Sequence, residues 1–386
     1  MELVETTWHV INVFVLLLAG GMISLNLRKS FHLPARRVML IYVWHTAWCL
    51  VYLWYSLNNA ADATLYYDAA RIGDYSFAPG TNFVKFLTGI FVNYLGLSYL
   101  GAFLAFNIFG VIGLLAFDGS MRIATENKKR RWRQLATLIV LLPSVSFWSS
   151  AIGKDAISFM ATCLALWASL DLGRRYRLMI FAVVAMFLVR PHMAGLMVFG
   201  LVLSIMLQSK ASIIKKIFFV GASLGAAAAL TPFALQYAGV ADASVAGVTE
   251  YMEQREGYNM DGGGAVDISS MSVPVRVATY LFRPFPHEAR SIPQLAASAD
   301  NLILIFVFVA GLVGIFVRRS VRQLDLNYFA LTYSALALFV LAMTTANLGI
   351  AVRQKWMFVP VLLFFWVSVI GSGQRQPARM RRATLR

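Results

Sequence analysis

The sequence has few charged residues. Only 13% of its 386 residues are Asp, Glu, Lys or Arg, whereas 59% are hydrophobic and the mean hydropathy is +0.68. Soluble globular proteins contain about 25% charged residues. A soluble chain of this composition would expose large apolar patches, which a lipid bilayer can cover. The composition therefore excludes an ordinary soluble protein and predicts one integral membrane domain over residues 1–386.

Three further features are missing. The only cysteines, Cys49 and Cys163, each lie in an apolar run, which argues against a disulfide or a cysteine metal site. No GxxxxGK[ST] motif occurs, so ATP-driven transport by this chain alone is not expected. Met1–Thr7 contains two glutamates and no basic residue, which is unlike a cleavable signal peptide. We therefore expect the first apolar run to stay in the protein as a helix.

Apolar runs occur along the whole chain and predict an all-α, polytopic transmembrane bundle of about eleven helices. They cover residues 8–27, 38–57, 95–117, 135–150, 156–170, 178–189, 193–207, 217–235, 302–317, 328–346 and 357–370. Several are shorter than the ~20 residues that a perpendicular crossing needs. The short ones are expected to end inside the protein, where other helices or a wet cavity cover the backbone.

The basic residues predict the orientation. Alternate boundaries between the apolar runs hold 24 of the 34 Lys and Arg but only four of the 18 acids. The positive-inside rule then places the N-terminus outside and the C-terminus in the cytoplasm. In a Gram-negative bacterium the outside is the periplasmic face of the inner membrane. The net charge of +16 follows from this asymmetry, so nucleic acid is not an expected partner. Residues 58–94 and 236–300 become external loops.

The first external loop carries Asp62, Asp68 and Asp74. On a helix Asp62 and Asp68 would lie about 120° apart, close enough to border one cavity. A carboxylate there can act as a general base on a sugar hydroxyl or hold a divalent metal against a lipid-linked phosphate. Asp62 and Asp68 are therefore the candidate catalytic residues, and the alternative is that they are solvated loop acids. No metal ligand is assigned, and Mg²⁺ or Mn²⁺ stays an open question as a cofactor.

The second loop has two parts. Its first part contains Asp261-Gly262-Gly263-Gly264, which is typical of a mobile flap or of a plain linker. Its second part, VPVRVATYLFRPFPHEAR, is rich in aromatic residues and proline and is expected to pack on the membrane surface.

Two short polar breaks between apolar runs contain candidate substrate-binding residues. Lys154 and Asp155 follow a turn after Pro143, which should break or bend the preceding helix. Lys154 can neutralise a phosphate, whereas Asp155 can be either a ligand or simply the N-cap of the next helix. Arg190 and His192 follow about a dozen apolar residues. An arginine at that depth needs an anion or a wet cavity unless it snorkels to the interface.

Two later segments add charged candidates on the same external side. In Arg283-Pro284-Phe285-Pro286-His287-Glu288 the prolines stiffen the backbone, which suits either a fixed group of charges or a re-entrant turn. Arg353 and Lys355 lie on the external side against the positive-inside trend. A pyrophosphate on a lipid carrier would explain them, because the forked donors of arginine match its oxygens.

The acidic loop with YYDAA resembles the C-type superfamily of polytopic glycosyltransferases, and the RPFPHE and NLGIAVRQKW segments are similar to those of bacterial surface-polysaccharide polymerases. The resemblance implies a polyprenyl-linked sugar donor, a glycan or glycolipid acceptor and an assembly complex as partners. C-type enzymes have the acidic loop after their first helix, but here it follows the second. Either an extra helix is present or the chain belongs to the polymerase group, in which Arg190, Arg283 and Arg353 would hold the leaving pyrophosphate.

These observations predict sugar transfer from a polyprenyl-phosphate carrier on the external face. A flippase or secondary transporter of an anionic glycolipid is the alternative, and a non-catalytic scaffold is a third reading. Charges buried in the middle of several helices would favour transport, whereas charges at one end of the helices favour an enzyme.

Overall fold

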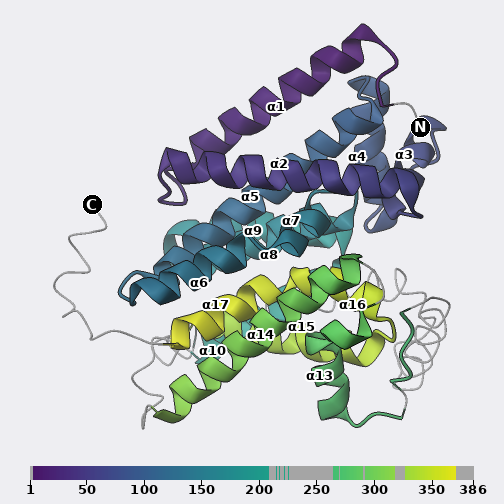
Figure 1. The fold of residues 1–386 in the computed structure, drawn as a ribbon. Coiled ribbons are helices and arrows are strands. Elements are labelled where there is room, and N and C mark those ends of the chain that lie inside the picture. Colours follow the sequence, from purple (N-terminus) through teal and green to yellow (C-terminus); the bar gives the residue numbers. More distant parts are fainter. Residues whose placement is uncertain are drawn as a thin grey trace.

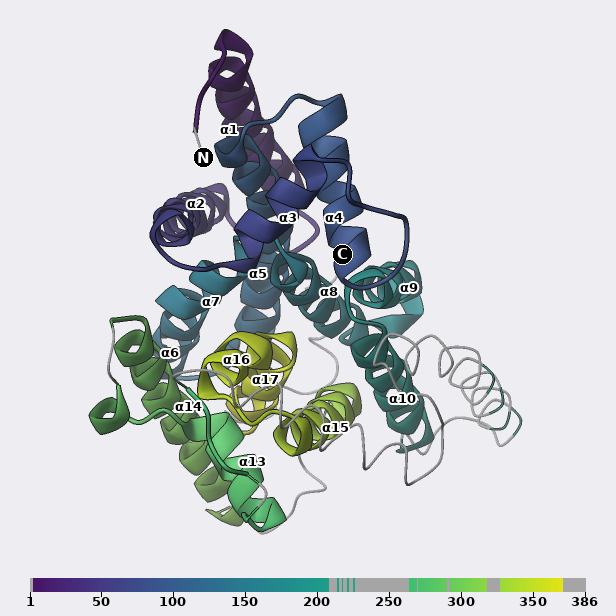
Figure 2. The ribbon, with the colours of Figure 1, turned by 90° about the vertical axis from the view of Figure 1, so that its right-hand side faces the viewer.

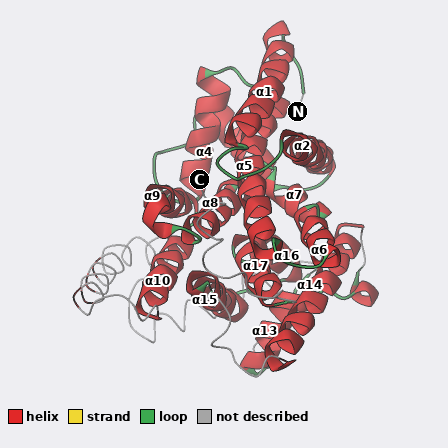
Figure 3. Cartoon of the chain, turned by 90° about the vertical axis from the view of Figure 1, so that its left-hand side faces the viewer, coloured by secondary structure: helices red, strands yellow, loops and turns green. Residues whose placement is uncertain are grey.

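The computed structural model describes residues 3–207, 264–268, 270–289, 292–317 and 327–370, with single positions at 214, 217, 221 and 225. These residues form helices joined by loops, and no β-sheet occurs among them (Figures 1 and 3). The all-α prediction is confirmed for this part of the chain. Apart from positions 217, 221 and 225, the predicted helix over 217–235 lies outside the described residues, as do most of the Gly-rich segment and the basic C-terminal tail.

The N-terminal helices are long and apolar. α1 covers Thr7–Leu27, α2 covers Ala35–Asn58 and α5 covers Tyr99–Thr125. Two of them begin at side-chain caps: Thr6 accepts a hydrogen bond from the backbone N–H of His9, and Ser98 accepts one from that of Gly101. Figure 1 shows α1 and α2 along the top of the molecule, with α5 beneath them.

The first predicted loop is itself helical. It contains α3 (Asp62–Arg71), α4 (Thr81–Gly89) and a short π-helix over Ile90–Tyr94. The connection to α4 is attached to the rest of the molecule, because the backbone N–H of Gly80 donates to the carbonyl of Leu188 at 2.8 Å. This segment is therefore a folded cap at one end of the bundle.

Proline and polar residues divide the middle of the chain. The predicted helix over 135–150 is broken into α6 (Arg130–Val140) and α7 (Pro143–Ser149), with Pro143 in the first turn of α7 as expected of a helix breaker. α8 (Lys154–Ser169), α9 (Leu172–Val189) and α10 (Pro191–Leu207) follow. The predicted breaks at Lys154–Asp155 and at Arg190 are confirmed.

The C-terminal part packs beneath these helices. It comprises α13 (Val273–Phe282), a 3-10 turn over Pro286–Glu288, α14 (Ile292–Val317), α15 (Tyr328–Thr344), α16 (Leu348–Gln354), a 3-10 turn over Lys355–Met357 and α17 (Val359–Val369). Figure 2 looks onto the end of the bundle that holds α3 and shows α16 and α17 below it.

Among the described residues, four helices are long and apolar enough to cross a membrane: Thr7–Leu27, Ala35–Asn58, Tyr99–Thr125 and Gln294–Phe316. A fifth candidate is the pair Leu348–Met357 and Val359–Val369, which is bent by 66°. At this bend the carbonyl of Met357 accepts hydrogen bonds from Thr162 at 2.5 Å and from Tyr333 at 2.9 Å. Such partners are needed where the backbone breaks inside an apolar environment. The chain is thus a multi-pass membrane protein by length and composition, and the predicted number of about eleven crossings stays a prediction.

Glycines allow the central helices to approach closely. A Cβ on Gly110 of α5 would lie 2.1 Å from the carbonyl oxygen of Ser149 and 2.5 Å from the His45 ring. His45 is itself held by Asn107 at 2.6 Å and by Ser149 at 2.9 Å, and it is fully buried. Small residues at helix contacts are typical of membrane proteins, because packing replaces the hydrophobic effect there.

We expect Gly110→Ala to destabilise the protein, because neither the Ser149 backbone nor the fixed His45 ring can yield without moving a helix. Overpacking of this kind costs about 1–3 kcal/mol. Gly195→Ala in α10 is the matched control, since nothing lies within 4 Å of its added Cβ. Thermal unfolding in detergent should show a clear drop for Gly110→Ala only, and equal behaviour of the two variants would contradict the packing described above.

Candidate functional site

Four of the predicted site residues meet in one ion network. Arg353 donates from Nη1 to Asp62 Oδ2 at 2.5 Å and from Nε to Asp155 Oδ2, while Arg190 Nη2 donates to Asp155 Oδ1 at 2.7 Å. The four side chains come from the start of α3, the start of α8, the α9–α10 junction and α16. The network therefore joins segments that are up to 291 residues apart.

Asp155 is placed by the first turn of α8. The helix begins at Lys154 with Gly153 as its N-cap and no side-chain capping bond. The interpretation of Asp155 as the N-cap is therefore wrong, because two guanidinium groups bind its carboxylate instead. A carboxylate in the first turn is also favoured by the helix dipole, which is positive at that end.

The two arginines lie where helices begin or end. Arg190 is the last residue before α10, and its carbonyl accepts hydrogen bonds from the N–H groups of Met193 and Ala194. Arg353 lies in α16, whose first N–H groups are capped by the Asn347 side chain at 2.9 and 3.2 Å. Asn347 also pairs with Ala265 in an isolated antiparallel bridge, which fixes the entry to α16. Both guanidinium groups are thus positioned by local backbone structure.

The network is buried at one side and open at the other. The side chains of Asp155 and Arg190 are each 10% exposed, whereas Arg353 is 23% and Asp62 is 44% exposed. Two acids and two arginines balance in charge. Among the described residues, the buried Nε of Arg190 has no hydrogen-bond partner. Asp62 is thus the most accessible member, and Arg190 retains an unused donor.

Aromatic rings line the network. Tyr52 and Tyr66 both lie within electrostatic range of Arg353, Asp155 and Asp62, and both are buried. Burial and then the nearby Asp62 charge raise the pKa of the Tyr66 phenol well above its usual value, so it stays neutral at physiological pH. These rings limit water around the charges and strengthen their interaction.

Other predicted residues lie outside the four-residue network. Asp68 is exposed on α3, and Asp74 pairs with Lys85 at 2.8 Å on the surface. Lys154 and His192 are partly buried, and each interacts with a neighbouring group. Asp62 is therefore the loop acid that the fold brings to the arginines.

The Arg283-Pro-Phe-Pro-His-Glu segment closes on itself. Arg283 binds Glu288 through two nitrogens at 2.5–3.1 Å, and Glu288 also accepts the backbone N–H of Phe285 at 2.8 Å. The hydrogen bond from Arg283 holds the pKa of Glu288 below its usual value. His287 is exposed and stacks on Phe285. This geometry matches the turn interpretation, because the guanidinium of Arg283 already has a carboxylate partner.

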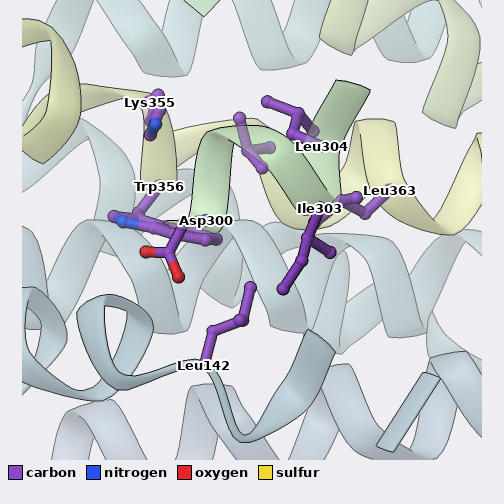
Figure 4. Close-up of a pocket in the computed structure, with 8 residues that line it drawn as sticks. Leu142, Asp300, Ile303, Leu304, Lys355, Trp356 and Leu363 are labelled. Carbon is purple, nitrogen blue, oxygen red and sulfur yellow. The ribbon is translucent and has the colours of Figure 1, made fainter. Parts of the chain in front are cut away.

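Lys355 belongs to a second, fully buried polar cluster. Its Nζ donates to Asn301 Oδ1, and the Asn301 amide donates to the carbonyl of Pro284 at 3.0 Å. Asp300 lies within electrostatic range of Lys355, and its buried Oδ2 has no hydrogen-bond partner among the described residues. Figure 4 shows Asp300, Lys355 and Trp356 around a small cavity with apolar walls. Asp300 and Asn301 were not among the predicted site residues, although two polar residues lie directly before an apolar run.

No group of three or more His, Cys, Asp and Glu side chains that could hold a metal ion occurs among the described residues. Asp62 and Asp155, the carboxylates nearest to the arginines, already bind guanidinium nitrogens. These two side chains therefore do not form a ready site for Mg²⁺ or Mn²⁺.

Asp155→Asn should destabilise the folded protein by about 3–5 kcal/mol, because it leaves the buried guanidinium group of Arg190 without its carboxylate partner and leaves Arg353 with Asp62 alone. Asp68→Asn is the matched control on an exposed residue and should change stability by less than about 0.5 kcal/mol. Thermal unfolding in detergent compares the two. A stable Asp155→Asn protein would show that the arginines have other partners.

For the cluster around Lys355 we expect the stability losses of two variants to be coupled. Lys355→Met should destabilise the protein because Asp300 loses the neighbouring positive charge, and the double variant Lys355→Met/Asp300→Asn should recover much of the loss. A double-mutant cycle on thermal unfolding measures this coupling. Strictly additive losses would show that the two residues do not interact.

Comparison with protein-family models, with curated proteins and with solved structures gave no match. The described residues form an all-helical membrane-type structure with four or five candidate spans, and no family is assigned to the chain. The ion network and the buried lysine cluster are the features on which a functional proposal rests.

Proposed function

We propose that the protein transfers sugar units from a polyprenyl-(pyro)phosphate carrier to a glycan or glycolipid acceptor at the external face of a bacterial inner membrane, as a glycosyltransferase or polymerase. The observation that carries the proposal is the convergence of Arg190 and Arg353 with a half-exposed carboxylate, Asp62, at the end of a membrane-type helix bundle. Arginine forks bind phosphate in the same way that they bind carboxylate.

Each residue then has a role. The donor phosphate binds Arg353 and the free Nε of Arg190, and it replaces Asp62 as a partner of Arg353. Asp155 is a positioning residue that holds both guanidinium groups. The polyprenyl tail lies along the apolar helices, where it needs no polar partner.

The reaction follows from this placement. The acceptor hydroxyl oxygen forms a bond with the anomeric carbon, and the bond between that carbon and the phosphate oxygen breaks. The electron pair goes to the leaving phosphate, whose growing charge the arginines stabilise. The released Asp62 carboxylate takes the hydroxyl proton as general base.

A second candidate function has its own support. Asp300 and Lys355 are charged residues buried in candidate spans, a feature common in transporters that move ions or anionic substrates. A flippase or secondary transporter of an anionic glycolipid is therefore the alternative.

Reconstitution into liposomes with a lipid-linked oligosaccharide tests these functions. The wild-type protein should form longer glycans, and Arg353→Gln should lower the rate about 100-fold, in line with loss of one charge-stabilising donor. Arg174→Gln, an exposed arginine outside the network, is the control. Thermal unfolding checks that each variant is folded.

Four outcomes oppose the proposal in different ways. The transporter is favoured if labelled lipid crosses the bilayer and the glycan chains are not extended. Absence of both glycan synthesis and lipid movement favours a non-catalytic scaffold, whereas wild-type glycan synthesis by both Arg190→Ala and Arg353→Ala shows that the arginines do not hold the donor. If folded Asp62→Asn keeps full activity, Asp62 is not the general base, whereas the proposed role of the arginines is unaffected.

A further inference from the structure

A second cationic surface lies at the opposite end of the bundle. α2 is 24 residues long, or about 36 Å, with Arg37 near its start and Asp62 shortly after its end. Arg37 binds Asp118 of α5 at 2.6 and 2.7 Å and donates to Thr137 of α6 at 3.1 Å. Figure 1 shows α6 towards the left of the bundle and α3 and α16 towards the right. The two charged regions are thus separated by most of the length of a membrane-type helix.

An open groove runs along α6 at this end. Arg130, Arg133, Gln134 and Thr137 line it, and their spacing places them on one face of the helix. Asp118 already matches the charge of Arg37. Within the described part of the chain, Arg130 and Arg133 form no ion pair, and the first turn of α6 contains no acid. The groove therefore carries two uncompensated guanidinium groups.

The same helix also presents apolar surface. Ala136, Ile139 and Val140 are buried against the bundle, whereas Leu138, one turn after Gln134, is 51% exposed. Trp132, next to the groove, has the Arg131 guanidinium 5.0 Å from its ring centre. A basic face with an adjoining apolar side and an interfacial tryptophan is typical of a helix that lies at a membrane surface. A ligand of this surface would be anionic at one end and apolar at the other.

We propose that the α6 groove binds the headgroup phosphate of an anionic phospholipid, with an acyl chain along Leu138. Arg130 and Arg133 bind the phosphate oxygens, and Gln134 and Thr137 offer hydrogen bonds to the glycerol. A lipid fits better than a soluble phosphate because the candidate spans α2 and α5 begin and end here and Leu138 adjoins the groove. This site is separate from the proposed transfer site and does not depend on it.

Native mass spectrometry of the full-length protein in detergent tests the site. We expect phosphatidylglycerol to bind more tightly than phosphatidylcholine with the same acyl chains, and Arg130→Gln/Arg133→Gln to weaken phosphatidylglycerol binding about 10- to 100-fold. Arg174→Gln/Arg177→Gln removes the same charge from another basic segment that does not line the groove, and it should bind as the wild type does. Equal losses in the two double variants, or no preference for the anionic lipid, would overturn the proposal.

A competition experiment separates the lipid from a soluble anion. Glycerol 1-phosphate at millimolar concentration should not displace phosphatidylglycerol. Leu138→Gln should weaken the binding of phosphatidylglycerol and leave the binding of glycerol 1-phosphate unchanged. Displacement by glycerol phosphate with no effect of Leu138→Gln would show a soluble-phosphate site instead. Thermal unfolding confirms that the variants are folded, and Arg130→Gln alone replaces the double variant if that one does not fold.

Discussion

The carboxylate of Asp155, bound by two guanidinium groups, is the interaction on which the candidate site depends. Burial removes water from these charges, so each of them needs an opposite charge close by. Asp155 meets this requirement for Arg190 and Arg353 at once, and Arg353 extends the network to Asp62. Four segments that are distant in the sequence are thereby held at fixed positions. Asp155 is thus the buried centre of the network, and Asp62 is its most exposed member.

Much of this site could be predicted from the sequence, but its pairing could not. Asp62, Asp155, Arg190 and Arg353 stand out because each is a charge beside an apolar run, which is costly without a partner. Which partner each one finds depends on contacts across up to 291 residues, and no local pattern encodes these. For Asp155 the local reading was an N-cap, and it failed because two arginines from elsewhere bind the carboxylate.

Arg353 and Lys355 are two positions apart in the sequence but belong to different clusters. Arg353 faces Asp155 and Asp62, whereas Lys355 is buried against Asn301. Between them α16 ends at Gln354 and a 3-10 turn begins at Lys355, so the local backbone directs the two side chains to different neighbours. The sequence placed both residues in one break between apolar runs and gave no sign of this change. The fold class, in contrast, followed from composition and apolar runs, and Pro143 marked the break between α6 and α7.

The two ends of the bundle differ in the charges that an anion would meet. At the α6 end, Arg130 and Arg133 form no ion pair with the described residues, so an anion that binds there displaces no carboxylate among them. At the Asp155 end, an incoming anion must compete with Asp62 for Arg353. If a singly charged anion displaces the Asp62 carboxylate, the negative charge next to Arg353 stays the same, so little electrostatic energy is gained. Under the proposed function, a doubly charged phosphate or a pyrophosphate would bring more negative charge than the carboxylate that it replaces, and it would gain a further donor in the Nε of Arg190, which has no hydrogen-bond partner among the described residues. The Asp62–Arg353 pair would then favour a multiply charged phosphate, such as a polyprenyl pyrophosphate, over a singly charged anion.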